Sequence, residues 1–149
     1  MTILKNTSIN LQVCKVEIVK ISDVASVNYG SNSVHRSVTL KTGKSWKQIY
    51  FTPGKLTFSS EQVNDVAGPS FNNKIVLPYP GEDDSTISDL DNLENGRFLT
   101  RITLNSGIIK LIGDLDSPCT CQISFSIEKS GRIIEFIQKS ILPAFNFSE

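Results

Sequence analysis

Short runs of valine and isoleucine, separated by segments rich in serine, asparagine and glycine, dominate the hydrophobic pattern of this chain. The clearest run covers residues 11–22 and predicts a long β-strand, because β-branched side chains suit a pleated surface. Its alternation divides five side chains between two faces: Leu11 and Val13 on one, Cys14, Val16 and Ile18 on the other. The alternation slips at Val19 and Ile21, which predicts a β-bulge or burial on both faces.

Runs of the same character predict further strands at 34–40, 46–51, 56–58, 74–77, 98–104, 108–112, 119–127 and 132–137. Three pairs of neighbouring runs are separated by short glycine-containing turns, at 41–45, 105–107 and 128–131. Each of these pairs predicts a hairpin. Residues 22–33 and 61–73 are rich in polar and turn-forming residues, and we interpret both segments as loops.

One segment has the periodicity of a helix. Residues 85–94 begin at Ser85, whose hydroxyl can cap a first turn, and carry Ile87, Leu90 and Leu93 on one face. A glycine at position 96 supplies the stop signal. Residues 141–147 are apolar but interrupted by a proline, and we expect them to pack as an extended arm.

Together these elements predict a mainly β fold: an antiparallel β-sandwich or small β-barrel of about eight or nine strands with one short flanking α-helix. The chain has 149 residues, of which 39% are hydrophobic and 20% charged. This is the size of one ordinary domain with a real core. We therefore expect a single domain over residues 1–149, with extended N- and C-terminal arms.

Charge is sorted along the chain although the net charge is zero. A basic group falls in a segment without acidic residues: Arg36, Lys41, Lys44, Lys47 and Lys55. An acidic group falls in a segment without basic residues: Glu82, Asp83, Asp84, Asp89, Asp91 and Glu94. The two groups are either solvated faces or complementary surfaces that join subunits head to tail and close a ring. The acidic group is also a candidate lining for a channel.

Composition excludes several classes of protein. A dedicated DNA-binding domain would normally be basic, so we expect no sequence-specific nucleic-acid binding. No run approaches the ~18 apolar residues of a membrane helix, so we expect no membrane partner. The first residues lack the pattern of a secretory signal, and an odd number of cysteines argues against a disulfide framework. We expect the chain to fold in a reducing cytoplasm.

No constellation of reactive residues points to catalysis. His35 is the sole histidine and would have to serve any nucleophile as its base. Cys119 and Cys121 lie two residues apart, but zinc needs four ligands, and only Cys14 and His35 could complete the set. We therefore predict no catalytic, metal or cofactor-binding residue, no cofactor and no enzymatic activity.

Three aromatic residues support a different function. Trp46, Tyr50 and Tyr79 could stack on a sugar or anchor a protein partner. The alternative to a structural role is therefore a carbohydrate- or protein-binding β-sandwich module.

A family resemblance favours the structural role. Residues 74–81 (KIVLPYPG), the acidic segment after them, and residues 101–113 (RITLNSGIIKLIG) resemble small virion proteins of tailed bacteriophages, of the tail-tube, tail-completion and neck types. The resemblance covers residues 55–137 and consists of strands and turns, so it assigns no individual functional residue. It implies a β-sandwich or barrel that forms rings or stacked tubes and has no active site.

The function expected from these observations is that of a non-enzymatic structural protein of a phage-like particle, in its tail or neck. Long loops, terminal arms and complementary charged surfaces would drive self-assembly into a ring or tube, with a hexamer as one arrangement. Its partners would be further copies and other virion proteins, with passive contact to DNA in transit. The expected location is the virion, assembled in the cytoplasm of the host bacterium.

Overall fold

The structure is a computed structural model. It describes residues 12–29, 35–52, 54–79, 88, 93–94, 96–126, 131–140 and 145–147. Within this part no helix has the length and apolar character needed to cross a membrane.

The described residues form a mainly β, antiparallel structure, as the sequence predicts. Its elements are β1 (Val13–Lys20), the 3-10 helix η1 (Ile21–Asp23), β2 (Val24–Tyr29), β3 (His35–Leu40), β4 (Lys47–Ile49), β5 (Thr57–Asp65), β6 (Gly68–Tyr79), β7 (Arg97–Leu104), β8 (Ile109–Ile112), β9 (Cys119–Ser126), β10 (Gly131–Ser140) and β11 (Phe145–Phe147). All eleven strands belong to one hydrogen-bonded sheet, which does not close into a barrel. Among the described pairs, β3 with β11 is parallel and the others are antiparallel.

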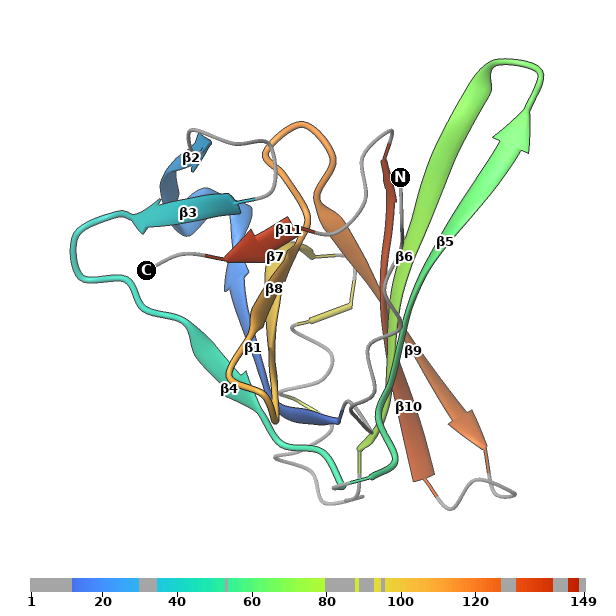
Figure 1. Cartoon of the computed structure of the whole chain (residues 1–149). Helices are drawn as coiled ribbons and strands as arrows, with labels where there is room; N and C mark the ends of the chain where they lie inside the picture. The colour runs from blue at the N-terminus through green and yellow to red at the C-terminus, as the bar shows by residue number, and fades with distance from the viewer. Residues whose placement is uncertain are drawn as a thin grey trace.

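Strand β7 connects two parts of the sheet, because different stretches of it pair with different strands. Residues 98–104 of this strand pair with β1, residues 100–103 pair with β8, and residues 97–98 pair with β9. One part of the sheet therefore runs β2-β3-β11-β8-β7-β1-β4, and the other runs β9-β10-β6-β5. Figure 1 shows the two parts facing each other, with β5 and β6 extending past the rest of the second part.

The main core lies between these two parts. Val16 and Ile102 come from β1 and β7, whereas Leu77, Ile134 and Phe136 come from β6 and β10, and all five belong to one buried cluster. Because each strand alternates its side chains, one face of each part supplies this cluster.

A second, smaller core lies on the opposite face of β1 and β7. Val19 and Leu99 are buried there with Leu111 and Val24, and Trp46 packs against them. Strand β1 is therefore buried on both faces, which confirms the two-sided burial predicted from its hydrophobic pattern. This is why its alternation breaks: both faces require apolar residues.

The faces predicted for the start of β1 are wrong, because the register shifts between Val13 and Lys15. Val13 lies opposite Leu104 and Val16 lies opposite Ile102, and all four contribute to the main core. The extra residue, Cys14, is exposed. A bulge thus puts Val13 and Val16 on the same face although they are three residues apart.

The hairpin predicted across residues 41–45 does not form. Strand β3 pairs with β2 and β11, while β4 pairs with β1. Residues 24–29, interpreted as part of a loop, form β2 instead. The serine and asparagine of this segment are tolerated because β2 is the end strand of the sheet within the described residues.

The loop predicted at residues 61–73 is also wrong, since β5 and β6 continue through it as a regular hairpin. Strand β6 contains two prolines, which cannot donate a backbone hydrogen bond to a neighbouring strand. Pro69 lies beyond the last residue of β6 that pairs with β10, and Pro78 lies beyond the last residue that pairs with β5. Among the described strands each proline therefore lies where β6 has a partner on one side only, a position at which its missing N–H is tolerated.

The flanking helix predicted over residues 85–94 is not confirmed. Ser88 has helical geometry and Leu93 and Glu94 form a turn, while the remainder of that range lies outside the described residues. The predicted N-terminal arm lies outside them too. Part of the predicted C-terminal arm forms β11, which lies between β3 and β8.

Candidate functional site

The far end of the β5–β6 hairpin, residues 61–71, is strongly exposed, and we call it the arm. Strand β10 ends its pairing with β6 at Phe71, so among the described residues the rest of the arm is a two-stranded ribbon. Figure 1 shows it projecting away from both parts of the sheet. Val66 at its tip is fully exposed, and Val63 is 38% exposed.

The outer edge of β5 is open within the described structure, because β5 pairs there with β6 alone. Its register is regular over nine residues, and the strand contains no proline, lysine or bulge. Natural proteins use such devices to prevent an edge strand from pairing with another chain. The charged residues of β5 are Glu61 and Asp65, both exposed, so this edge is acidic.

Four of the five predicted basic site residues lie together in sequence around β4. Lys41, Lys44, Lys47 and Lys55 are all exposed, and we call them the lysine surface. Within this group Lys44 forms an ion pair of 3.7 Å with Asp23. Strand β4 pairs with β1 alone among the described strands, so Lys47 lies on a strand with an open edge, and Lys44 and Lys55 lie on the segments before and after that strand.

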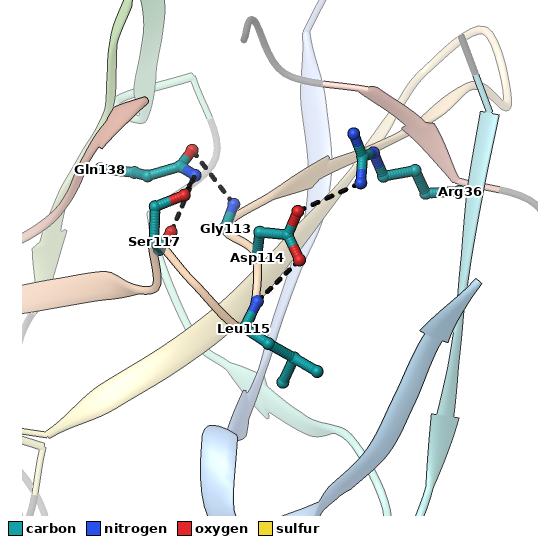
Figure 2. Close-up of polar contacts among 6 residues, drawn as sticks. All are labelled: Arg36, Gly113, Asp114, Leu115, Ser117 and Gln138. Atoms are coloured by element: carbon teal, nitrogen blue, oxygen red, sulfur yellow. Dashed lines mark hydrogen bonds and ion pairs between the residues drawn. The ribbon is translucent and has the colours of Figure 1, made fainter. Parts of the chain in front are cut away.

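Arg36, the fifth predicted basic residue, has a different environment. Its side chain is buried, and its Nη1 donates a hydrogen bond of 3.1 Å to Oδ2 of Asp114 (Figure 2). Oδ1 of the same carboxylate accepts a hydrogen bond of 2.7 Å from the backbone N–H of Leu115. Arg36 therefore joins β3 to the β8–β9 loop and is not part of the exposed lysine surface.

A second polar cluster closes one end of the main core. Ser60, Asn73 and Gln138 lie directly opposite one another on β5, β6 and β10. The Ser60 hydroxyl donates to Asn73 Oδ1 at 2.5 Å, and Asn73 Nδ2 donates to Gln138 Oε1 at 2.9 Å. Asn73 and Gln138 are buried, so these contacts offset the cost of removing the amides from water.

Gln138 carries this cluster across to the β8–β9 loop (Figure 2). Its Oε1 also accepts from the Gly113 N–H at 3.2 Å, while its Nε2 donates to the carbonyl of Ser117 at 2.8 Å. The Ser117 hydroxyl is a further acceptor at 3.1 Å. One amide thus ties the second part of the sheet to a loop that leaves the first part.

A third cluster lies on the face of β1 and β7 that carries the second core. The guanidinium of Arg101 donates from Nε to Glu17 Oε1 at 3.0 Å and from Nη2 to Oε2 at 3.1 Å. Its carbon lies 4.3 Å from the ring centre of Trp46 and 5.1 Å from that of Phe147. The C-terminal strand β11 is therefore anchored through one arginine that is also paired with a carboxylate.

The environment of Glu17 changes its ionisation. Burial raises the pKa of this carboxyl, but the hydrogen bond from Arg101 and the charges of Arg101 and Lys15 together outweigh burial. The net pKa of Glu17 lies below its ordinary value of 4.5. The carboxylate is therefore ionised at neutral pH and contributes to the stability of the fold.

Of the predicted acidic site residues, Glu94 is exposed, and the other five lie outside the described residues. Glu94 borders an open depression of about 450 Å³ that also includes Cys121 and Glu135. Among the described residues no three His, Cys, Asp or Glu side chains come together as metal ligands. Neither the depression nor its two carboxylates forms a recognisable site.

The cysteines differ in accessibility. Cys119 and Cys121 are buried in the main core, while Cys14 is exposed at the bulge. Burial raises the pKa of the Cys119 thiol to about 12, and burial together with the charge of Glu94 raises the pKa of Cys121 to about 12. Both buried thiols therefore act as apolar side chains.

The three aromatic candidates for a sugar site lie in different environments. Trp46 packs in the second core, Tyr79 packs against the main core, and Tyr50 is 62% exposed. They belong to separate clusters and do not build a shared platform.

Comparison of the chain with protein-family models, with curated proteins and with solved structures found no match.

The sequence indicated one of these two surfaces and missed the other. The arm was missed because residues 61–73 resemble a loop in composition, although Gly68-Pro69 could equally have marked a hairpin turn. The lysine surface was found, but its position beside an open strand edge depends on the pairing of β4 with β1. The arm is acidic and β4 carries Lys47, and Figure 1 shows the arm and β4 on different sides of the molecule.

Proposed function

We propose that this protein is a non-enzymatic structural protein of a phage-like particle, in its tail or neck, that self-assembles into a ring or tube. The observation that carries the proposal is the arm: a regular, projecting two-stranded hairpin with an open edge. The resemblance of residues 55–137 to small tailed-phage virion proteins supports the same function.

The arm supports self-assembly because its uncovered edge and apolar side chains are unfavourable in a molecule that stays alone in water. A two-stranded ribbon is marginally stable in water unless its face or edge is covered. Val63 and Val66 add apolar surface to it, while the open edge of β5 offers unpaired backbone donors and acceptors. Contact with another chain would satisfy both requirements.

The finer fold that we propose is an antiparallel β-sandwich. Its layers would be β2-β3-β11-β8-β7-β1-β4 and β9-β10-β6-β5, joined where β7 passes from β8 to β9. The shared core of Val16, Ile102, Leu77 and Phe136 supports this arrangement. A sandwich of this kind would present the arm at one end as a rigid extension of the second layer.

In such a particle the charged groups would work between molecules. The lysine surface would meet an acidic surface of a neighbouring copy. The acidic group would face either another subunit or DNA in transit, which it would repel and not bind. The terminal arms would reach further copies and other virion proteins.

The test is the mass and shape of the purified full-length chain. We expect light scattering to give a defined oligomer or a growing polymer at high protein concentration, and negative-stain images to show rings or tubes. A strict monomer at high concentration and low salt would contradict the proposal.

Matched variants connect the assembly to the arm. Val66→Lys places a positive charge at the arm tip, and Phe125→Lys places one at another exposed apolar side chain, on β9. We expect assembly to fall with Val66→Lys and to persist with Phe125→Lys. An equal loss with both variants would show that the arm has no special part in assembly.

A further inference from the structure

We propose that the open edge of β5 in one copy docks on the open edge of β4 in a second copy, so that the acidic arm lies against the lysine surface. This inference rests on the proposed self-assembly and names the two surfaces that form the contact. It replaces a general match between charged groups with one defined pair of strands.

The backbone supplies the first argument. Within the described structure β5 pairs with β6 alone and β4 pairs with β1 alone, so each strand has one open edge. Joining two open edges satisfies donors and acceptors on both, as in recognition by strand addition. β4 is only three residues long, so backbone pairing covers a short stretch and the side chains around it must supply the rest.

Charge supplies the second argument. Glu61 and Asp65 are the charged residues of β5, and both are exposed. Lys47 lies in β4 itself, with Lys44 and Lys55 on the segments before and after it, and all three are exposed. Opposite charges across an interface fix the partner and its register, and like charges exclude wrong partners.

Apolar side chains supply the third argument. Val63 lies between the two carboxylates of β5, and Val66 follows them at the tip of the arm. Tyr50 directly follows β4 and is 62% exposed. A tyrosine among lysines can cover the valines of the arm, and exposed aromatic residues of this kind often contribute most to binding.

The position of the two edges determines the kind of assembly. Figure 1 shows the arm and β4 on different sides of the molecule, so the arm tip cannot reach β4 of its own chain. The contact is therefore head to tail, between unlike surfaces. Head-to-tail contacts build rings when the rotation closes and open filaments when it does not.

The experiment uses two charge-reversed full-length variants. Glu61→Lys with Asp65→Lys makes the arm basic. Lys41→Glu with Lys47→Glu and Lys55→Glu makes the lysine surface acidic, and leaves Lys44 paired with Asp23. All five side chains are exposed, so each variant should keep the unfolding midpoint of the unmodified protein. We expect each variant alone to need about tenfold more protein, or more, to assemble.

Mixing the variants is the decisive step. The basic arm of the first variant matches the acidic surface of the second, and the unchanged arm of the second matches the unchanged surface of the first. We therefore expect an equimolar mixture to assemble at the concentration of the unmodified protein. Added salt should raise that concentration for the mixture and for the unmodified protein alike.

The possible results separate this inference from the proposed function. If the unmodified protein assembles and each variant alone assembles equally well, the β5–β4 contact is wrong and self-assembly stands. If each variant fails alone and the mixture also fails, the two charged groups do not face each other, and the inference is again overturned. If the unmodified protein never assembles, the proposed function itself fails.

Discussion

Glu17 and Arg101 lie directly opposite each other on β1 and β7, joined by hydrogen bonds of 3.0 Å and 3.1 Å. The pair lies on the face of these strands that carries the second core, where the Arg101 guanidinium packs on the rings of Trp46 and Phe147. It therefore links the central strand pair of the sheet to the C-terminal strand β11.

Replacing this arginine should destabilise the protein. Arg101→Met leaves the Glu17 carboxylate largely buried without its bidentate partner, and the cost should be about 1.5–3 kcal/mol in the free energy of unfolding. Urea denaturation followed by circular dichroism measures the loss. Lys139→Met, which removes an exposed cation from β10, serves as the control and should change stability by less than about 0.5 kcal/mol. Equal effects would mean that the pair contributes nothing of its own.

The same pair predicts a dependence of stability on pH. Because the folded-state pKa of Glu17 lies below 4.5, its contribution is fully present above that value and is lost as the pH falls through the lowered pKa. Glu17→Gln removes the contribution at every pH. We expect the stability difference between the unmodified protein and Glu17→Gln to be largest near pH 7 and to shrink below pH 4.5. A difference that stays constant down to pH 3 would contradict this assignment.

The Gln138 side-chain amide should contribute strongly to stability, because it forms hydrogen bonds with Asn73, Gly113 and Ser117. Gln138→Met would leave Asn73 Nδ2 and the Gly113 N–H without their acceptor, at a cost of about 2–3 kcal/mol. Gln122→Met, at an exposed position on β9, is the matched control, with an expected change within about 0.5 kcal/mol. Thermal unfolding of both variants measures the difference, and similar midpoints would show that the buried network adds no stability.

Substitution of two glycines with positive φ, Gly107 and Gly113, separates the cost of backbone strain from the cost of a steric clash. Gly107 (φ 90°) has no atom within 4 Å of an added Cβ, so Gly107→Ala should cost about 1–2 kcal/mol through the backbone alone. At Gly113 (φ 108°) the same Cβ would lie 3.1 Å from Leu99 Cδ2 and 3.2 Å from the Phe98 carbonyl. Gly113→Ala should therefore be clearly less stable than Gly107→Ala in urea. The reverse order would contradict the packing of the β8–β9 loop against β7.

The cysteines should react at different rates with a thiol reagent. At pH 8 Cys14 is exposed and should be modified within minutes, whereas Cys119 and Cys121 are buried and have pKa values raised to about 12. We expect one thiol per chain to react in the folded protein and three in denaturant. Rapid reaction of two or more thiols in the folded protein would contradict the burial of Cys119 and Cys121.

The order of residues was enough to predict the fold class and two of the three expected hairpins, whereas the hairpin expected at 41–45 does not form. The runs at 98–104 and 108–112 form β7 and β8, and those at 119–127 and 132–137 match β9 and β10. In these hairpins the turn residues lie directly between the partners, so local chemistry is enough to choose the pairing. The two-sided burial of β1 could also be predicted, because a strand covered on both faces needs apolar residues at successive positions.

The pairing of distant strands and the burial of particular polar residues depend on contacts that the sequence does not reveal. Arg36 appears in sequence as one more basic residue, yet the fold buries it beside Asp114, 78 residues further along the chain. The β5 strand has a loop-like composition because its edge is open and its side chains are exposed, so hydrophobic burial leaves no pattern in it. Local preferences cannot reveal such features, because the free energy that forms them comes from contacts between residues far apart in the sequence.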